Sequence, residues 1–458
     1  MRGNARKLIL ACASAVIIIL SGVSLICTGR LSNAGSRTVQ TNRVEPGNPA
    51  PAPGTTLPEI NINAAAFKGQ GRLAFVCGGL LYVLDGQTGT LRRLTTDGIA
   101  SQPVWSPDGE WLAFLRATGP QAAPAVWLTR RDGAQAHQVP APAVFDSFSH
   151  LSWLGSGDVL EVSGENGVWL VPVTGASRQL AEDPGMVSPD GQTLAYAATT
   201  LSDTENRSDT LYTVAVTGGR PVWRLAASQD NRIILAGWWP DGKGLLYWLD
   251  PGYSADAMAG GVDLHSLRLG DAAPKLLTSG FDRQGWLSMS PQNNLLMVQG
   301  RERLTWADKS LALINVAAGQ IREMQNPAGC VSIDPAISAD GKRIAFVAAN
   351  DLGDNVEGFN SNKDLMAWVA SRTLWVERAD GSGAHPLPSA GQGVYQPLWS
   401  RDGSHILYAR DNSLWLIGAD GGEPARICGP LSYEDPLAGV FGYFGFISYQ
   451  DEVAWYQP

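Results

Sequence analysis

The sequence predicts an all-β protein, an eight-bladed β-propeller, and three observations support this. A short apolar strand followed by a tight turn recurs along the chain, a second strand follows each turn, and a third strand, commonly with an aromatic centre, comes next. The 458 residues include 52 Gly, 28 Pro and 16 Trp but only 17% charged residues, which supplies many turns and many large buried side chains. This composition suits neither a helical bundle nor a disordered chain.

The first strand type ends in a turn of the Ser-Pro-Asp-Gly kind. Proline presets the second turn position, aspartate can bond its own backbone, and glycine accepts a positive φ. The motif is therefore a hairpin turn rather than a site. Seven copies occur, at Pro103–Gly109, Leu151–Asp158, Met186–Gly191, Gly237–Gly242, Leu287–Asn293, Ala336–Gly341 and Leu398–Gly403.

The second and third strand types each occur eight times. The second begins at Leu73, Trp111, Val159, Thr193, Leu245, Leu295, Ile344 and Ile406. The third is centred on Tyr82, Trp127, Trp169, Tyr212, His265, Ala312, Trp375 and Trp415, and short fourth strands follow, as at Leu91 and Lys275. A repeat of about 49 residues suits a four-stranded propeller blade. Seven blades, with one degenerate repeat, is the alternative.

The eighth copy of the first strand is expected near the carboxyl end, at Phe444–Ser448. This strand would pair with the amino-terminal strands of Leu73–Thr95 in one shared sheet. Such pairing removes the free edges that a ring of sheets would otherwise expose.

The amino terminus predicts a membrane anchor over residues 1–29 and a Pro-rich linker over residues 30–65, before a propeller over residues 66–458. Leu8–Thr28 is an uncharged run of 21 residues behind Arg2, Arg6 and Lys7. As a helix it would span about 31 Å, enough to cross a bilayer, with the basic flank in the cytoplasm and the propeller outside. The alternative is a cleaved signal peptide, which would leave a secreted or periplasmic protein, but secretory apolar regions are usually shorter.

Charge and cysteine content limit the partners and the redox chemistry. After the first 65 residues the chain has 28 basic and 41 acidic residues, a net charge of −13. Such a surface repels phosphate backbones and excludes nucleic acid as an expected partner. Three cysteines, Cys77, Cys330 and Cys428, lie outside the apolar run, so at most one disulfide can form, and a role as small buried side chains is favoured.

The Ser-Pro-Asp-Gly hairpins followed by Leu-Ala-Phe strands resemble the TolB-like group of bacterial propellers. The resemblance covers the chain from about Ala66 to its end. It implies an extracytoplasmic protein that binds partner proteins, an outer-membrane lipoprotein among them, without catalysis. The eight predicted blades, the missing helical amino-terminal domain and the anchor with its Pro-rich linker depart from TolB, so the resemblance carries over the fold and the non-catalytic expectation but no binding residue.

Three connections between second and third strands are long, at Thr199–Thr210, Asp250–Asp263 and Ala349–Arg372. Connections of one kind lie on one face of a propeller, and long loops on a rigid scaffold commonly bind ligands. These loops are acidic, and the predicted binding-face residues are Asp203, Glu205, Asp209, Asp250, Asp256 and Asp263.

The densest acidic stretch is Asp351–Asp364, which predicts two alternatives. Clustered carboxylate and amide oxygens with glycines are suitable Ca²⁺ ligands, and the candidate ligands are Asp351, Asp354, Asn355, Glu357 and Asp364. The spacing does not match an EF-hand, so a solvated acidic loop is the favoured alternative. No other cofactor is predicted.

The predicted function is that of a membrane-tethered, non-catalytic binding or scaffold module in the bacterial envelope, whose partner is a protein, a peptide or a cell-wall component. The sequence contains no Gly-x-Ser-x-Gly, His-Glu-x-x-His, Cys-x-x-Cys or phosphate-binding-loop motif. The alternative is a propeller-only enzyme, a lyase or glycoside hydrolase, with carboxylates that converge at the central channel. A purely structural spacer in an envelope complex is the third possibility.

Overall fold

The computed structural model describes residues 60–458, apart from residues 120–121, 141–148, 156, 165, 202–206, 228–230, 252–260, 283, 302–303, 354–361 and 432–451. The predicted anchor and most of the predicted linker therefore lie outside the described residues. Within the described residues no helix has both the length and the apolar character needed to cross a membrane.

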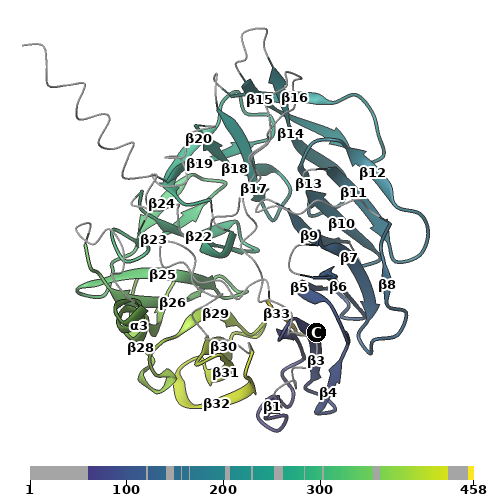
Figure 1. The fold of residues 1–458 in the computed structure, drawn as a ribbon. Helices are drawn as coiled ribbons and strands as arrows, with labels where there is room; N and C mark the ends of the chain where they lie inside the picture. The colour runs from purple at the N-terminus through teal and green to yellow at the C-terminus, as the bar shows by residue number, and fades with distance from the viewer. Residues whose placement is uncertain are drawn as a thin grey trace, which may run out of the picture. The chain divides into compact units, whose positions relative to one another are not determined.

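Eight antiparallel sheets form the fold, and Figure 1 shows them arranged around a common axis. We number them as blades 1 to 8 along the chain, so that the predicted eight-bladed ring is confirmed and the seven-bladed alternative is wrong. Each blade has an innermost strand before the turn, then the second, third and fourth strands outward, as the repeat predicted.

The strands of the first four blades are as follows. Blade 1 contains β33 (Val453–Tyr456), β2 (Arg72–Cys77), β3 (Leu80–Asp85) and β4 (Thr90–Arg93); blade 2 contains β5 (Ile99–Trp105), β6 (Trp111–Ala117), β7 (Ala125–Arg130) and β8 (His137–Gln138). Blade 3 contains β9 (His150–Leu154), β10 (Val159–Gly164), β11 (Gly167–Pro172) and β12 (Arg178–Ala181); blade 4 contains β13 (Gly185–Val187), β14 (Thr193–Leu201), β15 (Arg207–Ala215) and β16 (Val222–Ala226).

The remaining blades complete the ring. Blade 5 contains β17 (Arg232–Trp238), β18 (Gly244–Asp250), β19 (Val262–Arg268) and β20 (Lys275–Gly280); blade 6 contains β21 (Leu287–Ser290), β22 (Asn294–Gln299), β23 (Ser310–Asn315) and β24 (Gln320–Glu323). Blade 7 contains β25 (Cys330–Ile337), β26 (Arg343–Asn350), β27 (Thr373–Arg378) and β28 (His385–Pro386); blade 8 contains β29 (Tyr395–Trp399), β30 (His405–Arg410), β31 (Ser413–Gly418), β32 (Gly421–Gly429) and β1 (Asn61–Ile62). The helices within the described residues are η1 (Gln284–Trp286), α3 (Asn362–Ala370) and η2 (Pro388–Ala390).

A strand from the carboxyl end closes the ring, but it is not the predicted one. β33 pairs with β2, with Ala454 opposite Ala74 and Trp455 opposite Leu73. The expected closing strand Phe444–Ser448 lies outside the described residues, and the closing position belongs to Val453–Tyr456, nine residues further on. Both segments are apolar and aromatic, so the repeat pattern alone did not separate them.

The predicted linker contributes a strand of its own. β1 lies within the segment assigned to the linker and pairs antiparallel with the outer edge of β32, with Ile62 opposite Cys428. Blade 8 thereby gains a fifth strand, so an outer edge of this propeller accepts an added extended segment.

Apolar side chains pack between neighbouring blades. One cluster joins blades 1 and 2, and others join blades 2 and 3, 3 and 4, 4 and 5, and 5 and 6, while the largest spans blades 6, 7, 8 and 1. Second strands supply fully buried residues such as Leu73, Leu112 and Leu407. Burial of this apolar surface is the main term that stabilises each pair of blades.

Tryptophan side chains also bond adjacent blades. The indole N–H groups of Trp105, Trp153, Trp238 and Trp399, near or at the ends of innermost strands, donate to carbonyl oxygens of the preceding blade's innermost strand. The acceptors are Ala454, Val104, Met186 and Ala336, at 3.2, 3.0, 2.9 and 3.1 Å. The abundance of tryptophan thus has a structural reason, since each ring fills the space between blades while its polar edge is satisfied.

Cys77 and Cys428 are buried, as predicted, whereas Cys330, which was also predicted to be buried, is half-buried. No disulfide joins these three described cysteines. The Cys77 thiol donates to the carbonyl oxygen of Pro430 at 2.9 Å, which fixes the end of blade 8 to blade 1.

Candidate functional site

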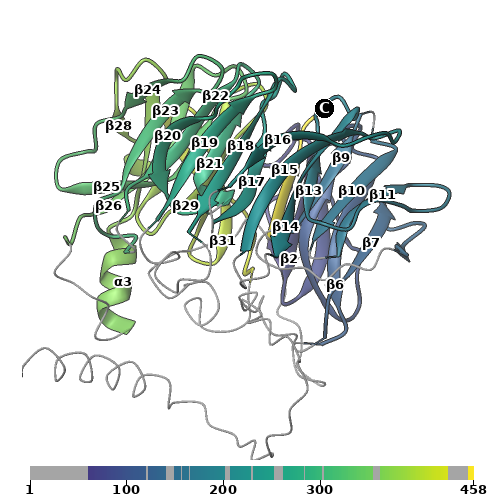
Figure 2. The same ribbon diagram turned by 90° about the horizontal axis from the view of Figure 1, so that it is seen from above.

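The connections between second and third strands emerge on the face of the ring where each fourth strand also leads into the next blade. We call this the loop face. Figure 2 shows α3 projecting from one side of the ring, within the connection between β26 and β27. The sequence did not predict this helix, which buries Trp368 and Val369.

Asp209 lies in a strand rather than in the predicted exposed loop. β14 and β15 form a long hairpin in which Thr199 is opposite Asp209, so much of the predicted Thr199–Thr210 loop is strand. The Asp209 carboxylate is buried and accepts hydrogen bonds from the Thr199 hydroxyl at 2.8 Å and from the Ile233 N–H at 2.9 Å. It therefore ties blade 4 to the first residues of blade 5.

Asp250 lies at the end of β18 on the same face. Burial raises the pKa of its carboxyl group, the charges of Asp282 and Asp209 raise it further, and the Arg232 guanidinium partly opposes them. Its Oδ1 is buried without a hydrogen-bond partner among the described residues. Asp183, in the connection into blade 4, has its pKa raised by burial and by the charges of Asp209 and Glu182. Carboxylates whose charge is not fully compensated therefore lie on the loop face on both sides of blade 4.

Asp263 is compensated instead. It lies in β19, where the Arg301 guanidinium forms an ion pair with it and the Ser279 hydroxyl donates to its Oδ1 at 2.5 Å. Arg301 also donates to the Ser279 hydroxyl at 2.8 Å. This network holds the outer part of blade 5 to blade 6, so Asp263 has a structural role at this position.

The predicted calcium ligands are only partly described. Asp351 is exposed, and its Oδ1 accepts the N–H of Gly353 at 2.8 Å; Asp364 is exposed in the first turn of α3. Asp354, Asn355 and Glu357 lie outside the described residues, as do Asp203, Glu205 and Asp256 of the other two loops. No group of three or more potential metal ligands occurs within the described part of the chain. The calcium site therefore stays a prediction.

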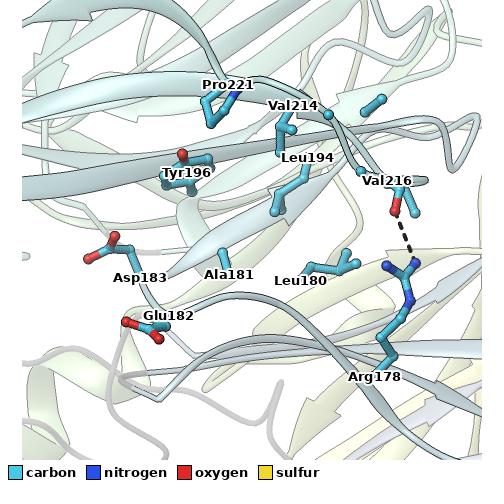
Figure 3. Close-up of a pocket in the computed structure, with 13 residues that line it drawn as sticks. Arg178, Leu180, Ala181, Glu182, Asp183, Leu194, Tyr196, Val214, Val216 and Pro221 are labelled. Atoms are coloured by element: carbon cyan, nitrogen blue, oxygen red, sulfur yellow. Dashed lines mark hydrogen bonds between the residues drawn. The ribbon is translucent and has the colours of Figure 1, made fainter.

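A cavity of about 360 Å³ lies between blades 3 and 4. Figure 3 shows its lining: β12 with Leu180 and Ala181 faces Leu194 and Tyr196 of β14 and Val214 of β15. Glu182 and Asp183 lie at one end, and at the other Arg178 donates to the carbonyl oxygen of Val216 at 3.0 Å. The cavity has an apolar floor, an acidic end and a basic end, and a size typical of ligand sites.

Two pairs of ionisable side chains were missed by the sequence. His150 in β9 lies 3.4 Å from Glu161 in β10, and the same Glu161 oxygen accepts the Val187 N–H at 2.8 Å. In blade 7 the buried Arg372 forms an ion pair with Asp334 and donates to the carbonyl oxygen of Val394 at 3.1 Å. No local spacing announces such pairs, because their members come together only when the blades form.

Seven four-stranded blades and one five-stranded blade, closed by strands from both ends, define the chain as an eight-bladed β-propeller. No family model matches it. Tricorn protease homolog 1 of Streptomyces coelicolor is 26% identical over 307 residues, a match that covers 63% of this chain and only 25% of that protein. The chain thus matches about a quarter of this curated relative.

Solved structures share the fold at low identity. Dipeptidyl peptidase 4 of Porphyromonas gingivalis is similar with a TM-score of 0.52 and 11% identity, over 84% of this chain and 63% of that one. TolB of Acinetobacter baumannii is similar with a TM-score of 0.34 and 14% identity, over 80% of this chain and 65% of that one. The predicted resemblance to TolB-like propellers is confirmed at the level of the fold, and similarity at this identity shows the fold alone.

Proposed function

We propose that the chain is a membrane-tethered, extracytoplasmic binding or scaffold module that acts without catalysis. The observation that carries the proposal is the pair of under-compensated carboxylates on the loop face beside blade 4, with Asp183 between blades 3 and 4 and Asp250 in blade 5. The raised pKa values of Asp183 and Asp250 indicate that the fold holds negative charge there against burial and mutual repulsion. A cationic group of a partner would relieve both costs. The partner is then an envelope protein, a peptide or a cell-wall component with a basic surface.

The sequence of the three acidic loops also supports the loop face as the binding surface. Asp203, Glu205, Asp256, Asp354 and Glu357 add five carboxylates to connections that start and end on it. Should Ca²⁺ bind at Asp351–Asp364, it would organise one of these loops for the partner. The apolar run Leu8–Thr28 supplies the proposed tether.

The experiment compares partners captured by the full chain from detergent-solubilised membranes. One variant replaces Asp203, Asp256 and Asp354 with Asn, and Glu205 and Glu357 with Gln. A matched variant makes the same kind of replacement at five acidic positions in or beside turns between third and fourth strands, on the opposite face: Asp132, Asp271, Asp380, Asp420 and Glu423. We expect the loop variant to lose the partner and the matched variant to keep it. Equal capture by both would overturn the loop-face proposal.

The tether is tested separately by fractionation. The full chain should remain with membranes after a carbonate wash, and added protease should digest its propeller from the extracytoplasmic side. Release of the chain into the soluble extracytoplasmic fraction would instead favour the cleaved signal peptide.

His150 and Glu161 favour one alternative, a propeller-only lyase or glycoside hydrolase, because a histidine beside a buried carboxylate can transfer protons. Glu161 already serves the backbone of blade 4, which is why binding is the favoured function. Turnover of oligosaccharides by the purified chain that is lost in His150→Gln would support the enzyme instead.

A further inference from the structure

The outer strand of blade 4 departs from the repeat. In every blade a fourth-strand residue pairs with the position at the centre of the third strand. These residues, from blade 1 to blade 8, are Arg93, Gln138, Gln179, Trp223, Leu276, Glu323, Pro386 and Arg426. Only blades 4 and 5 place a large apolar side chain there, and Trp223 is 61% exposed. Trp223 thus presents a large aromatic surface to a partner at a position where most blades carry a polar residue.

Trp223 continues an aromatic row that leads from the cavity of Figure 3 to the edge of the blade. Tyr196, which lines the cavity, stacks on Tyr212 with ring centroids 5.6 Å apart, and Tyr212 is paired with Trp223 across β15 and β16. The three residues lie at paired positions on neighbouring strands, so they share the side of blade 4 that faces blade 3. Tyrosine and tryptophan at such a surface commonly anchor bound peptides.

The acidic end of the cavity offers two carboxylates to a cation. Glu182 and Asp183 are adjacent in the chain, and neither forms an ion pair with a described residue. The Asp183 carboxyl is half-buried between blades. A lysine or arginine side chain that entered from the edge would meet these carboxylates and could stack on Tyr196.

The groove is open to an extended segment. β12 is the last strand of blade 3, and no described strand pairs with its outer edge. β12 also forms one wall of the cavity, so a segment beside it would direct alternate side chains into the cavity. Blade 8 shows the same event within the chain, because β1 covers the outer edge of β32.

We propose that the groove between β12 and blade 4 binds an extended peptide segment of a partner protein, with a lysine or arginine at Glu182 and Asp183 and with Trp223 as the apolar anchor. This inference rests on the proposed binding function and names the partner's chemistry. It places the contact on the flank between two blades, where the loop substitutions of the previous experiment do not reach.

The test uses the full chain in detergent and a fluorescein-labelled octapeptide in which lysine alternates with valine or threonine, so that the peptide favours an extended conformation. A second octapeptide has glutamate in place of lysine. Fluorescence anisotropy measures the affinity of both. We expect the lysine peptide to bind and the glutamate peptide not to bind. Trp223→Ala should lower the affinity for the lysine peptide at least about tenfold, and so should the double variant Glu182→Gln with Asp183→Asn.

The matched control is Ile321→Ala with Glu323→Gln on β24, which removes an exposed apolar residue and a carboxylate from the outer strand of blade 6. The affinity of this control variant for the lysine peptide should stay within about twofold of that of the unaltered chain. The groove proposal would be overturned if the lysine peptide bound both groove variants as tightly as the unaltered chain, or if it did not bind the unaltered chain. Neither result would change the interpretation of the capture experiment on the loop face. A dimer that Trp223→Ala dissociates would assign the groove to a second copy and would also overturn the proposal.

Discussion

The aromatic ring of Tyr456, in the last strand, lies against the Cα of Gly109, in the first Ser-Pro-Asp-Gly turn. Gly109 has a φ of +66°, and its carbonyl oxygen accepts a hydrogen bond from Arg72 at 2.9 Å. The guanidinium of Arg72 in turn lies over the Tyr456 ring, 5.4 Å from its centroid. The closing strand is therefore held by its pairing with β2 and also by a turn of the next blade.

The first prediction follows from this contact. Gly109→Ala should destabilise the chain more than Gly191→Ala, because a Cβ at Gly109 would overlap the Tyr456 ring whereas a Cβ at Gly191 meets open space. Both glycines occupy the same position in turns of the same kind, with φ of +66° and +72°, so the backbone strain is matched. We expect about 1 kcal/mol for Gly191→Ala and about 2–4 kcal/mol for Gly109→Ala. Urea unfolding measures both, and equal losses would show that the closing strand does not depend on this turn.

The second prediction concerns the tryptophans that join the blades. Trp238→Phe removes the hydrogen bond to the carbonyl oxygen of Met186 in blade 4 and part of the packing between blades, so it should cost about 2 kcal/mol. Trp169→Phe is the matched change, because the Trp169 indole donates at 3.3 Å to Asn166 of its own blade. It should cost about 1 kcal/mol or less. Equal effects on the free energy of unfolding would contradict a role for these bonds in joining blades.

The blades could be predicted because their information is local. Ser400, Asp402 and His405 illustrate this: the Ser400 hydroxyl donates to Asp402 at 2.7 Å and accepts the His405 N–H at 2.8 Å, all within six residues. Apolar strands on either side of such turns occur seven times, and the eighth blade is completed by a strand from the carboxyl end. Each repeat therefore predicts its own hairpin without reference to the rest of the chain.

The candidate site could not be predicted in the same way, because it depends on contacts between residues that are far apart in the sequence. Asp209 was expected in a loop because it lies in a long connection between second and third strands, yet pairing across β14 and β15 extends the hairpin and buries it against Ile233 of the next blade. The helix α3 lies inside an acidic connection and was missed. Its Trp368 packs edge-on against Trp306 of blade 6, with ring centroids 6.0 Å apart, and this contact between distant residues is not visible in the local sequence. The cavity between β12 and β14 likewise exists only when two blades meet.

The third prediction concerns the dependence of stability on pH. Because burial, first of all, raises the pKa of Asp250 in the folded chain, ionising it costs more in the folded state than in the unfolded state. The cost is absent at pH values below the unfolded pKa of about 4, grows as the pH rises through the folded pKa, and is complete above it. Asp250→Asn should therefore raise the melting temperature at pH 7 by about 1–3 °C and leave it unchanged at pH 3.

Asp402→Asn supplies a control of opposite sign. Hydrogen bonds from the hydroxyl groups of Ser400 and Ser404 and from the Ser404 N–H lower the pKa of Asp402 to about 2. Its carboxylate therefore stabilises the folded chain above the unfolded pKa, and this contribution is lost as the pH falls toward 2. Asp402→Asn should lower the melting temperature at pH 7, and the difference should shrink with acidification. A loss of stability at pH 7 in Asp250→Asn as well would mean that the Asp250 carboxylate has a compensating partner and is not available to a cationic ligand.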